Sequence, residues 1–227
     1  MAEFFTQDTF AFLNRLAKHN NRDWFNEHKL EYELQVREPA LDFIRAMQPA
    51  LASFAPHFVA IDKKIGGSLM RVYRDVRFSK NKTPYKTHIG IQFRHEQGKD
   101  VHAPGFYLHV ESHEVFVGAG IWHPDAPTLK KIRTYIDAHP TRWKDACDDV
   151  NFAKVFSLTG DSLKRAPKGY PMQHPLIEDL KRKDFIGIAP LAPELLLQDD
   201  LVGLISSYFE TAAPFMQQLC RATGVRW

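Results

Sequence analysis

Residues 87–122 read THIGIQFRHEQGKDVHAPGFYLHVESHEVFVGAGIW, and this stretch decides the fold. Apolar side chains return at every second position, which is the period of a β-strand with one buried face. The pattern predicts three strands, at 87–94, 106–111 and 115–122. Short links, such as the turn-forming residues 96–100, leave no room for a crossover helix, so we expect antiparallel pairing.

Upstream of this stretch the chain is expected to be helical before it joins the sheet. Phe10, Leu13 and Leu16 recur at helical spacing, and Asn20-Asn21 ends that pattern and caps a second helix. A third helix is expected to begin near Pro39. Two more period-two segments, 58–62 and 68–78, extend the predicted sheet.

Downstream of the sheet the helical period returns. Asp125 is expected to cap a helix, and a second helix follows Pro140. Residues 151–198 are rich in Pro, Gly and charge, which predicts an irregular stretch with short helices. Residues 201–219 are helical again, with Pro214 as a kink.

Together these segments predict an α+β fold, in which a central antiparallel sheet of about residues 58–122 is flanked by N-terminal and C-terminal helices. We expect residues 1–227 to form a single domain, because this length is within the range of one large domain. That domain is expected to be helical over 1–55, mainly β over 58–122, and helical and irregular over 125–227.

Composition indicates a folded, water-soluble protein. Hydrophobic residues make up 44% and charged residues 25% of the chain, as in ordinary globular proteins. No apolar run reaches the roughly 18 residues of a membrane span, and Glu3 and Asp8 stand where a signal peptide needs positive charge. We therefore expect a cytoplasmic protein without a membrane partner. Cys147 and Cys220 are expected to be buried thiols.

The positive charge of the chain is concentrated in residues 71–86, RVYRDVRFSKNKTPYK. Six Lys and Arg residues against Asp75 alone give this segment a local charge of +5, while the whole chain carries only +3. Interleaved aromatic residues favour semi-buried packing or stacking on a ligand. Arg74 falls among apolar alternate positions, so we expect it to have a partner or to be turned outward by a bulge.

Side-chain alternation divides the predicted sheet into two faces. The apolar face is expected to form the core and to include Val76 and Phe78 at the end of segment 68–78. The polar face is expected to form the floor of a pocket, unless it is simply the side that an antiparallel sheet shows to water. Its members are Arg71, Tyr73, Asp75, Arg77, Gln92, Tyr107, His109 and Glu111, with Gly118 and Gly120 leaving space beside them.

Arginine forks and lysine ammonium groups near exposed backbone N–H groups are what phosphate or carboxylate recognition requires. Pro84 stiffens the turn that presents them. The residues expected to bind an anion are Arg71, Arg74, Arg77, Ser79, Lys80, Lys82, Tyr85, Lys86 and Tyr107. A solvated charged face is the alternative for this segment.

His109 and Asp75 are the candidate catalytic residues, with His109 as a general acid or base whose pKa a carboxylate adjusts. His109, His113 and Glu114 have the spacing of a helical metal site, but here they fall on a strand and a turn, so no metal is expected. No cofactor is expected either, because the chain has no phosphate-binding loop of the GxxxxGK[ST] type and no complete dinucleotide fingerprint.

The sequence resembles an uncharacterised bacterial and fungal family catalogued as a domain of unknown function. The resemblance rests mainly on the long basic motif at 74–86, RDVRFSKNKTPYK, and also on 21–25, 105–107 with His109, and 167–170 with His174-Pro175. It spans nearly the whole chain. It implies a shared fold and a shared site at the basic motif, without implying an activity.

Three classes of function follow from these residues. The first is binding, and in an enzyme turnover, of a small anionic ligand that bears phosphate or carboxylate. The second is a nucleic-acid-binding module, in which the same cations contact backbone phosphates and Tyr73 or Tyr85 stacks on bases. The third is a protein-interaction domain, in which residues 71–86 form a structural network of ion pairs.

Overall fold

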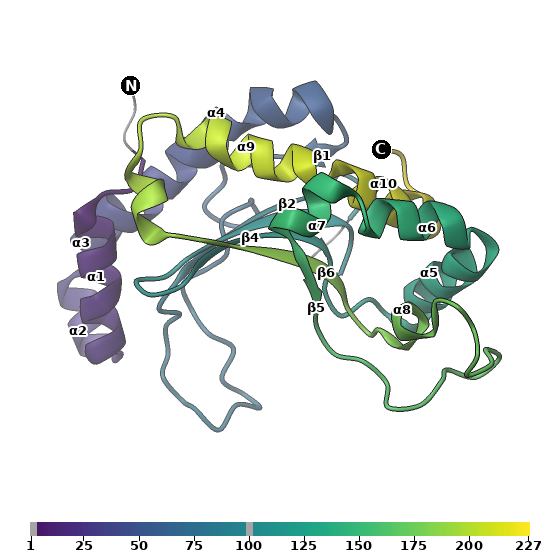
Figure 1. Cartoon of the computed structure of the whole chain (residues 1–227). Helices are drawn as coiled ribbons and strands as arrows, with labels where there is room; N and C mark the ends of the chain where they lie inside the picture. Colours follow the sequence, from purple (N-terminus) through teal and green to yellow (C-terminus); the bar gives the residue numbers. More distant parts are fainter. Residues whose placement is uncertain (1–3, 99–101) are drawn as a thin grey trace.

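A six-stranded antiparallel sheet forms the centre of the computed structural model, which describes residues 4–98 and 102–227 (Figure 1). Glu3 and the last two residues of the turn expected at 96–100 lie outside this range. In spatial order the strands are β1 (Phe58–Val59), β2 (Ile89–His95), β3 (Gly105–Val110), β4 (Val115–Ile121), β6 (Phe185–Leu191) and β5 (Ser157–Thr159). The α+β fold predicted from the sequence is therefore confirmed.

Helices precede and follow the first four strands of this sheet. The N-terminal ones are α1 (Gln7–Lys18), α2 (Arg22–Glu27), α3 (Lys29–Tyr32), the π-helical turn η1 (Glu33–Arg37) and α4 (Glu38–Phe54). The later ones are α5 (Ala126–Ala138), α6 (Pro140–Cys147), α7 (Val150–Val155), α8 (Ile177–Lys181), the 3-10 turn η2 (Pro193–Leu197), α9 (Leu201–Thr211) and α10 (Ala213–Thr223).

The expected helix caps are present. The Asn21 side chain accepts a hydrogen bond from the Trp24 N–H, and the Asp125 side chain accepts one from the Thr128 N–H. At Pro214 the structure differs from the expected kink, because α9 ends at Thr211 and Pro214 lies in the first turn of α10. Proline is tolerated there, since its missing N–H would have no partner within the helix.

One face of the sheet forms the hydrophobic core. Ile91, Phe93, Phe106, Leu108 and Val117 are all fully buried on this face. Helices α4, α9 and α10 lie across it (Figure 1). The alternation predicted for β2, β3 and β4 is confirmed, because the apolar set at every second position is the set that these helices cover.

The sheet extends beyond the expected range of residues 58–122. β6 pairs with β4, from Val115 opposite Leu191 to Ile121 opposite Phe185, and β5 pairs with the outer edge of β6. Both strands come from the stretch that was expected to be irregular. The buried side of β6 consists of Phe185, Gly187, Ala189 and Leu191, so two of its four core positions carry small residues with little strand signal.

Segment 68–78 is not the regular strand that its alternation predicted. Two isolated bridges, Leu69 with Ile91 and Tyr73 with Tyr85, hold it against the chain that leads into β2. Four residue steps separate Leu69 from Tyr73, but six separate Tyr85 from Ile91, so the register shifts by two residues. The pairing ends at Pro84, which has no N–H to donate.

Because the strand ends there, the apolar positions expected at its far end do not join the core. Val76 is only half-buried, and Phe78 is 94% exposed. The Arg71–Lys86 segment instead extends from the side of the sheet opposite α9 (Figure 1). It is a projecting loop with a short paired base.

Two further expectations concern the thiols and the membrane. Cys220 is buried, as expected, and burial raises the pKa of its thiol to about 12. Cys147 is half-buried, and burial raises its pKa as well, so both thiols are protonated at neutral pH. Within the described residues, every helix is too short or too polar to span a bilayer.

Candidate functional site

The helices α9 and α10 lie on one face of the sheet (Figure 1), and the alternation of β2 and β3 directs their polar side chains to the other face. We call this the open face. Tyr107, at its centre, is half-buried and faces Gly118 on the neighbouring strand. A Cβ atom on Gly118 would stand 3.4 Å from the Tyr107 Cβ, which is about an ordinary van der Waals distance. The space that the sequence assigned to Gly118 is therefore small.

Tyr107 and His109 form a polar pair on β3. The Tyr107 hydroxyl lies 3.2 Å from Nδ1 of His109. The His109 ring stacks on Phe116 at 4.6 Å between ring centroids and 7° between planes, and the residue is only 8% exposed. Gly90 makes this arrangement possible, because a Cβ there would stand 2.7 Å from the Tyr107 hydroxyl.

His88 and Glu111 complete the cluster, although the sequence did not single out His88. The His88 and His109 ring centroids are 4.4 Å apart. Glu111 Oε2 lies 3.6 Å from His109 Nε2, while Glu111 Oε1 accepts a 2.5 Å hydrogen bond from the Thr87 hydroxyl. His88 directly precedes β2, in which Ile89 pairs with Val110 and Gly90 with His109, so it lies beside Glu111 and His109. The alternation of the predicted strand 87–94, which puts His88 on the same face as Gln92, is the signal that could have found it.

Burial keeps both imidazoles of this cluster neutral at pH 7. It lowers the pKa of His88 to about 4, and the proximity of His109 and Lys86 lowers this pKa as well. It also lowers the pKa of His109, an effect that Glu111 opposes. Burial raises the pKa of the Tyr107 hydroxyl, which therefore stays protonated. The cluster presents neutral donors and acceptors beside one carboxylate.

Lys86 lies on the same side, next to Met70, whose sulfur, like the Tyr107 hydroxyl, borders Gly90. Its Nζ is 3.9 Å from the Met70 sulfur. Burial lowers the pKa of Lys86, and the charge of Arg71 lowers it further. Among residues 4–98 and 102–227, Lys86 has no carboxylate within 4.0 Å. This ammonium group is therefore both partly buried and unpaired.

Three of the other cations of the loop have partners within the loop itself. Arg74, the anomaly of the sequence pattern, donates to the Thr83 carbonyl and hydroxyl across the turn. Arg77 forms an exposed ion pair with Asp75 at 2.7 Å, and this partner lowers the pKa of Asp75 to about 2. Lys82 donates to the Val76 carbonyl at 2.8 Å. These contacts hold the loop in shape, and they use the charges of Arg74, Arg77 and Lys82 within it.

Tyr85 has a structural position at the base of the loop. It is buried and stacks on Phe25 of α2, with ring centroids 4.0 Å apart. The Asn20 side chain forms two hydrogen bonds with the Tyr85 backbone, each 3.0 Å long. The loop is thus anchored to the N-terminal helices.

The structure brings together part of the site that the sequence predicted. Lys86, Tyr107 and His109 share the open face, with Arg71 beside Lys86. Arg74 is close enough for its charge to act on His88. The members that lie along the projecting loop or at its base instead are Asp75, Arg77, Ser79, Lys80, Lys82 and Tyr85.

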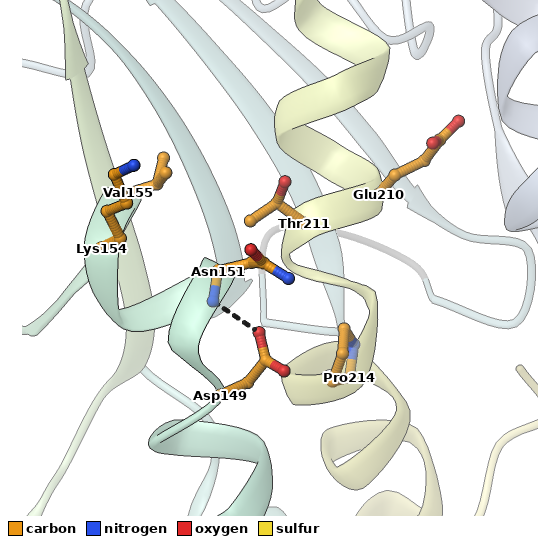
Figure 2. A pocket seen from close by; sticks show the side chains of 7 residues that line it. All are labelled: Asp149, Asn151, Lys154, Val155, Glu210, Thr211 and Pro214. Atoms are coloured by element: carbon orange, nitrogen blue, oxygen red, sulfur yellow. Dashed lines mark hydrogen bonds between the residues drawn. The ribbon is translucent and has the colours of Figure 1, made fainter.

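A depression of about 470 Å³ lies on the helical side, between α7 and the junction of α9 and α10 (Figure 2). The carboxylate of Asp149 is used to cap α7, accepting from the backbone N–H groups of Asn151 and Phe152 at 3.0 Å each. Lys154 and Glu210 extend to opposite sides of this depression (Figure 2). Its polar groups do not converge on one point, so the open face is the better candidate site.

The fold defines an α+β protein whose antiparallel sheet has the helices α4, α9 and α10 on one face. The open face carries two neutral histidines, a tyrosine and an unpaired lysine. The chain belongs to the family described as conserved hypothetical protein (DUF2461), whose model matches residues 8–217. No curated protein and no solved structure matches the chain.

Proposed function

We propose that the chain binds a small anionic ligand, bearing phosphate or carboxylate, on the open face beside Lys86 and Arg71. The observation that carries this proposal is a pair of neighbouring cations, neither of which forms a salt bridge with a carboxylate of the described residues, although the charge of Arg71 also acts on Asp75. A partly buried ammonium group costs free energy unless a negative charge compensates it. An anion on the open face would supply that charge.

The groups beside this pair suit an oxyanion. Tyr107 carries a protonated hydroxyl, and the neutral imidazole of His88 lies near Lys86. A phosphate or carboxylate needs several donors aimed at it, and charge-assisted hydrogen bonds from Lys and Arg are the strongest of these. The proposed contacts are Lys86, Arg71 and Tyr107, with His109 positioned behind Tyr107 as the candidate acid or base.

A nucleic-acid ligand is the second candidate, and the exposed Phe78 favours it. This ring is 94% exposed at the projecting loop, with the Arg77 guanidinium 5.8 Å from its centroid. An exposed aromatic ring beside cations is a platform on which an unpaired base stacks. The two candidates use different surfaces, since Phe78 belongs to the loop and Lys86 to the open face.

The test is a thermal-unfolding titration with inorganic phosphate, run at constant ionic strength with EDTA present. Phosphate is expected to raise the Tm of the wild type and of Lys80→Met, whose side chain is exposed, but not that of Lys86→Met. Equal stabilisation of both variants, or no stabilisation by phosphate, pyrophosphate and dicarboxylates, contradicts the proposal. Single-stranded DNA serves as a further titrant, and strongly salt-dependent binding that Phe78→Ala abolishes would support the second candidate instead.

A further inference from the structure

We propose that His88, His109 and Glu111 bind a divalent transition-metal ion such as zinc. Each residue offers one ligand atom, and the three atoms lie within 4.8 Å of one another. Two imidazole nitrogens and one carboxylate oxygen also bind zinc in catalytic sites, where a further position stays open to water or substrate. This proposal departs from the expectation that the chain holds no metal site, which weighed only His109, His113 and Glu114.

The distances are already close to those of a metal site. Nε2 of His109 and Oε2 of Glu111 are 3.6 Å apart. Two donors at about 2.1 Å from a tetrahedral ion stand about 3.4 Å apart, so this pair needs almost no movement. His88 immediately precedes β2, and its ring centroid is 4.4 Å from that of His109. An adjustment of the His88 side chain brings in the third ligand.

Groups around the cluster orient the ligand atoms. Thr87 donates to Oε1 of Glu111 and leaves Oε2 directed at His109. When Nδ1 of His109 carries the proton, it donates to the Tyr107 hydroxyl, and Nε2 presents a lone pair toward Glu111. Outer partners of this kind fix the orientation of histidine and carboxylate ligands in metal sites.

The ligand atoms also lack other partners. Nε2 of His109 is buried without a hydrogen bond to any described residue. His88 forms no side-chain hydrogen bond with the part of the chain that the structure describes. A buried imidazole nitrogen without a hydrogen-bond partner is costly, and a metal ion would give it one. A structural histidine would normally be satisfied by a hydrogen bond.

The test is a calorimetric titration of the EDTA-treated full chain with zinc chloride, without phosphate. The wild type is expected to bind one equivalent, and His88→Gln and Glu111→Gln are each expected to weaken binding at least tenfold. The matched control is His113→Gln, because His113 is exposed on the adjoining turn and lies outside the cluster. Cobalt provides a second readout, since the visible absorption of the bound ion reports on its coordination number and geometry.

Circular dichroism of each variant checks that it is folded, and His88 and Glu111 are chosen because both are only half-buried. The proposal is overturned if the wild type binds no zinc, or if both variants bind it as tightly as His113→Gln does. The Lys86→Met variant is expected to retain the metal. Because phosphate binding is measured with EDTA and metal binding without phosphate, each proposal fails independently of the other.

Discussion

At Gly120 the backbone of β4 passes so close to β6 that no side chain fits. A Cβ atom there would stand 1.9 Å from the Phe185 carbonyl oxygen, and the residue has a φ of 140°. Both the contact and the dihedral angle exclude other residues. The sequence indicated that Gly120 leaves space on the polar face, but what the residue provides is close pairing with a strand that the sequence did not predict.

We expect Gly120→Ala to lower the free energy of unfolding by about 2–3 kcal/mol, because both the backbone strain and the clash must be relieved. Gly66→Ala is the matched control. Gly66 also has a positive φ, of 71°, but nothing lies within 4 Å of its added Cβ, so it should cost about 1 kcal/mol. Urea denaturation measures both variants, and equal destabilisation would show that the clash with β6 is absent.

The candidate site was predictable where the strand period held and not elsewhere. Tyr107 and His109 follow from the alternation of β3, which the structure confirms. His88 also lies on this face by the alternation of the strand predicted at 87–94, but its chemistry becomes evident only when the β2–β3 register sets it beside His109 and Glu111. Asp75 and Arg77 were expected on the sheet, but their charges stay in the projecting loop, where they pair with each other.

At the scale of an element, the Arg71–Lys86 loop is anchored at Tyr85 by residues of the N-terminal helical region. Asn20 lies in the link between α1 and α2, and its amide both donates to and accepts from the Tyr85 backbone. The Asn20 side chain thus makes the two backbone hydrogen bonds that a neighbouring strand would make with Tyr85. Phe25 covers the same residue from α2.

We expect Asn20→Ala to make the loop about tenfold more sensitive to trypsin, which cleaves after Lys and Arg. Each lost hydrogen bond is worth about 0.5–1.5 kcal/mol. About 1.4 kcal/mol corresponds to a tenfold increase in the fraction of molecules in which the loop is detached and open to cleavage. Mass spectrometry of the fragments identifies cleavage within residues 71–86. Asn151→Ala is the control, since this exposed side chain contacts nothing in the loop. Unchanged cleavage in Asn20→Ala would mean that the stacking of Tyr85 on Phe25 is sufficient to hold the loop in place.

The helices and the first strands were predictable from local periodicity and capping, because those signals lie within a few residues of each other. Strand β6 was not, since it has Gly187 and Ala189 at core positions and Pro190 near its end. Its place is set by β4, more than sixty residues away. The local sequence of β6 therefore gives no signal of this long-range pairing.

At the scale of the whole molecule, a continuous core joins residues from Phe5 to Ala222. His95 at the end of β2 adds a link to the C-terminus, because its Nε2 lies 2.8 Å from the Arg226 carbonyl oxygen. The N-terminal helix α4 and the C-terminal helix α9 also pack on each other. The expectation of a single domain remains a prediction, and these contacts support it.

We therefore expect one cooperative unfolding transition in urea. Far-UV circular dichroism follows the helices, while tryptophan fluorescence follows Trp24 in α2, Trp143 in α6, and also Trp122 and Trp227. Coincident curves are the signature of a two-state transition. In Trp24→Phe, the fluorescence signal comes from the three tryptophans outside the N-terminal helices and should give the same midpoint. Two separated transitions would instead divide the chain into independent units.

The helices α4, α9 and α10 cover one face of the sheet, so neighbouring positions of a strand differ in what a substitution does. A substitution at Ile91 changes the packing against these helices, whereas one at Gln92 changes the open face. Alternate positions of β2 can therefore be redesigned while the positions between them keep the core intact.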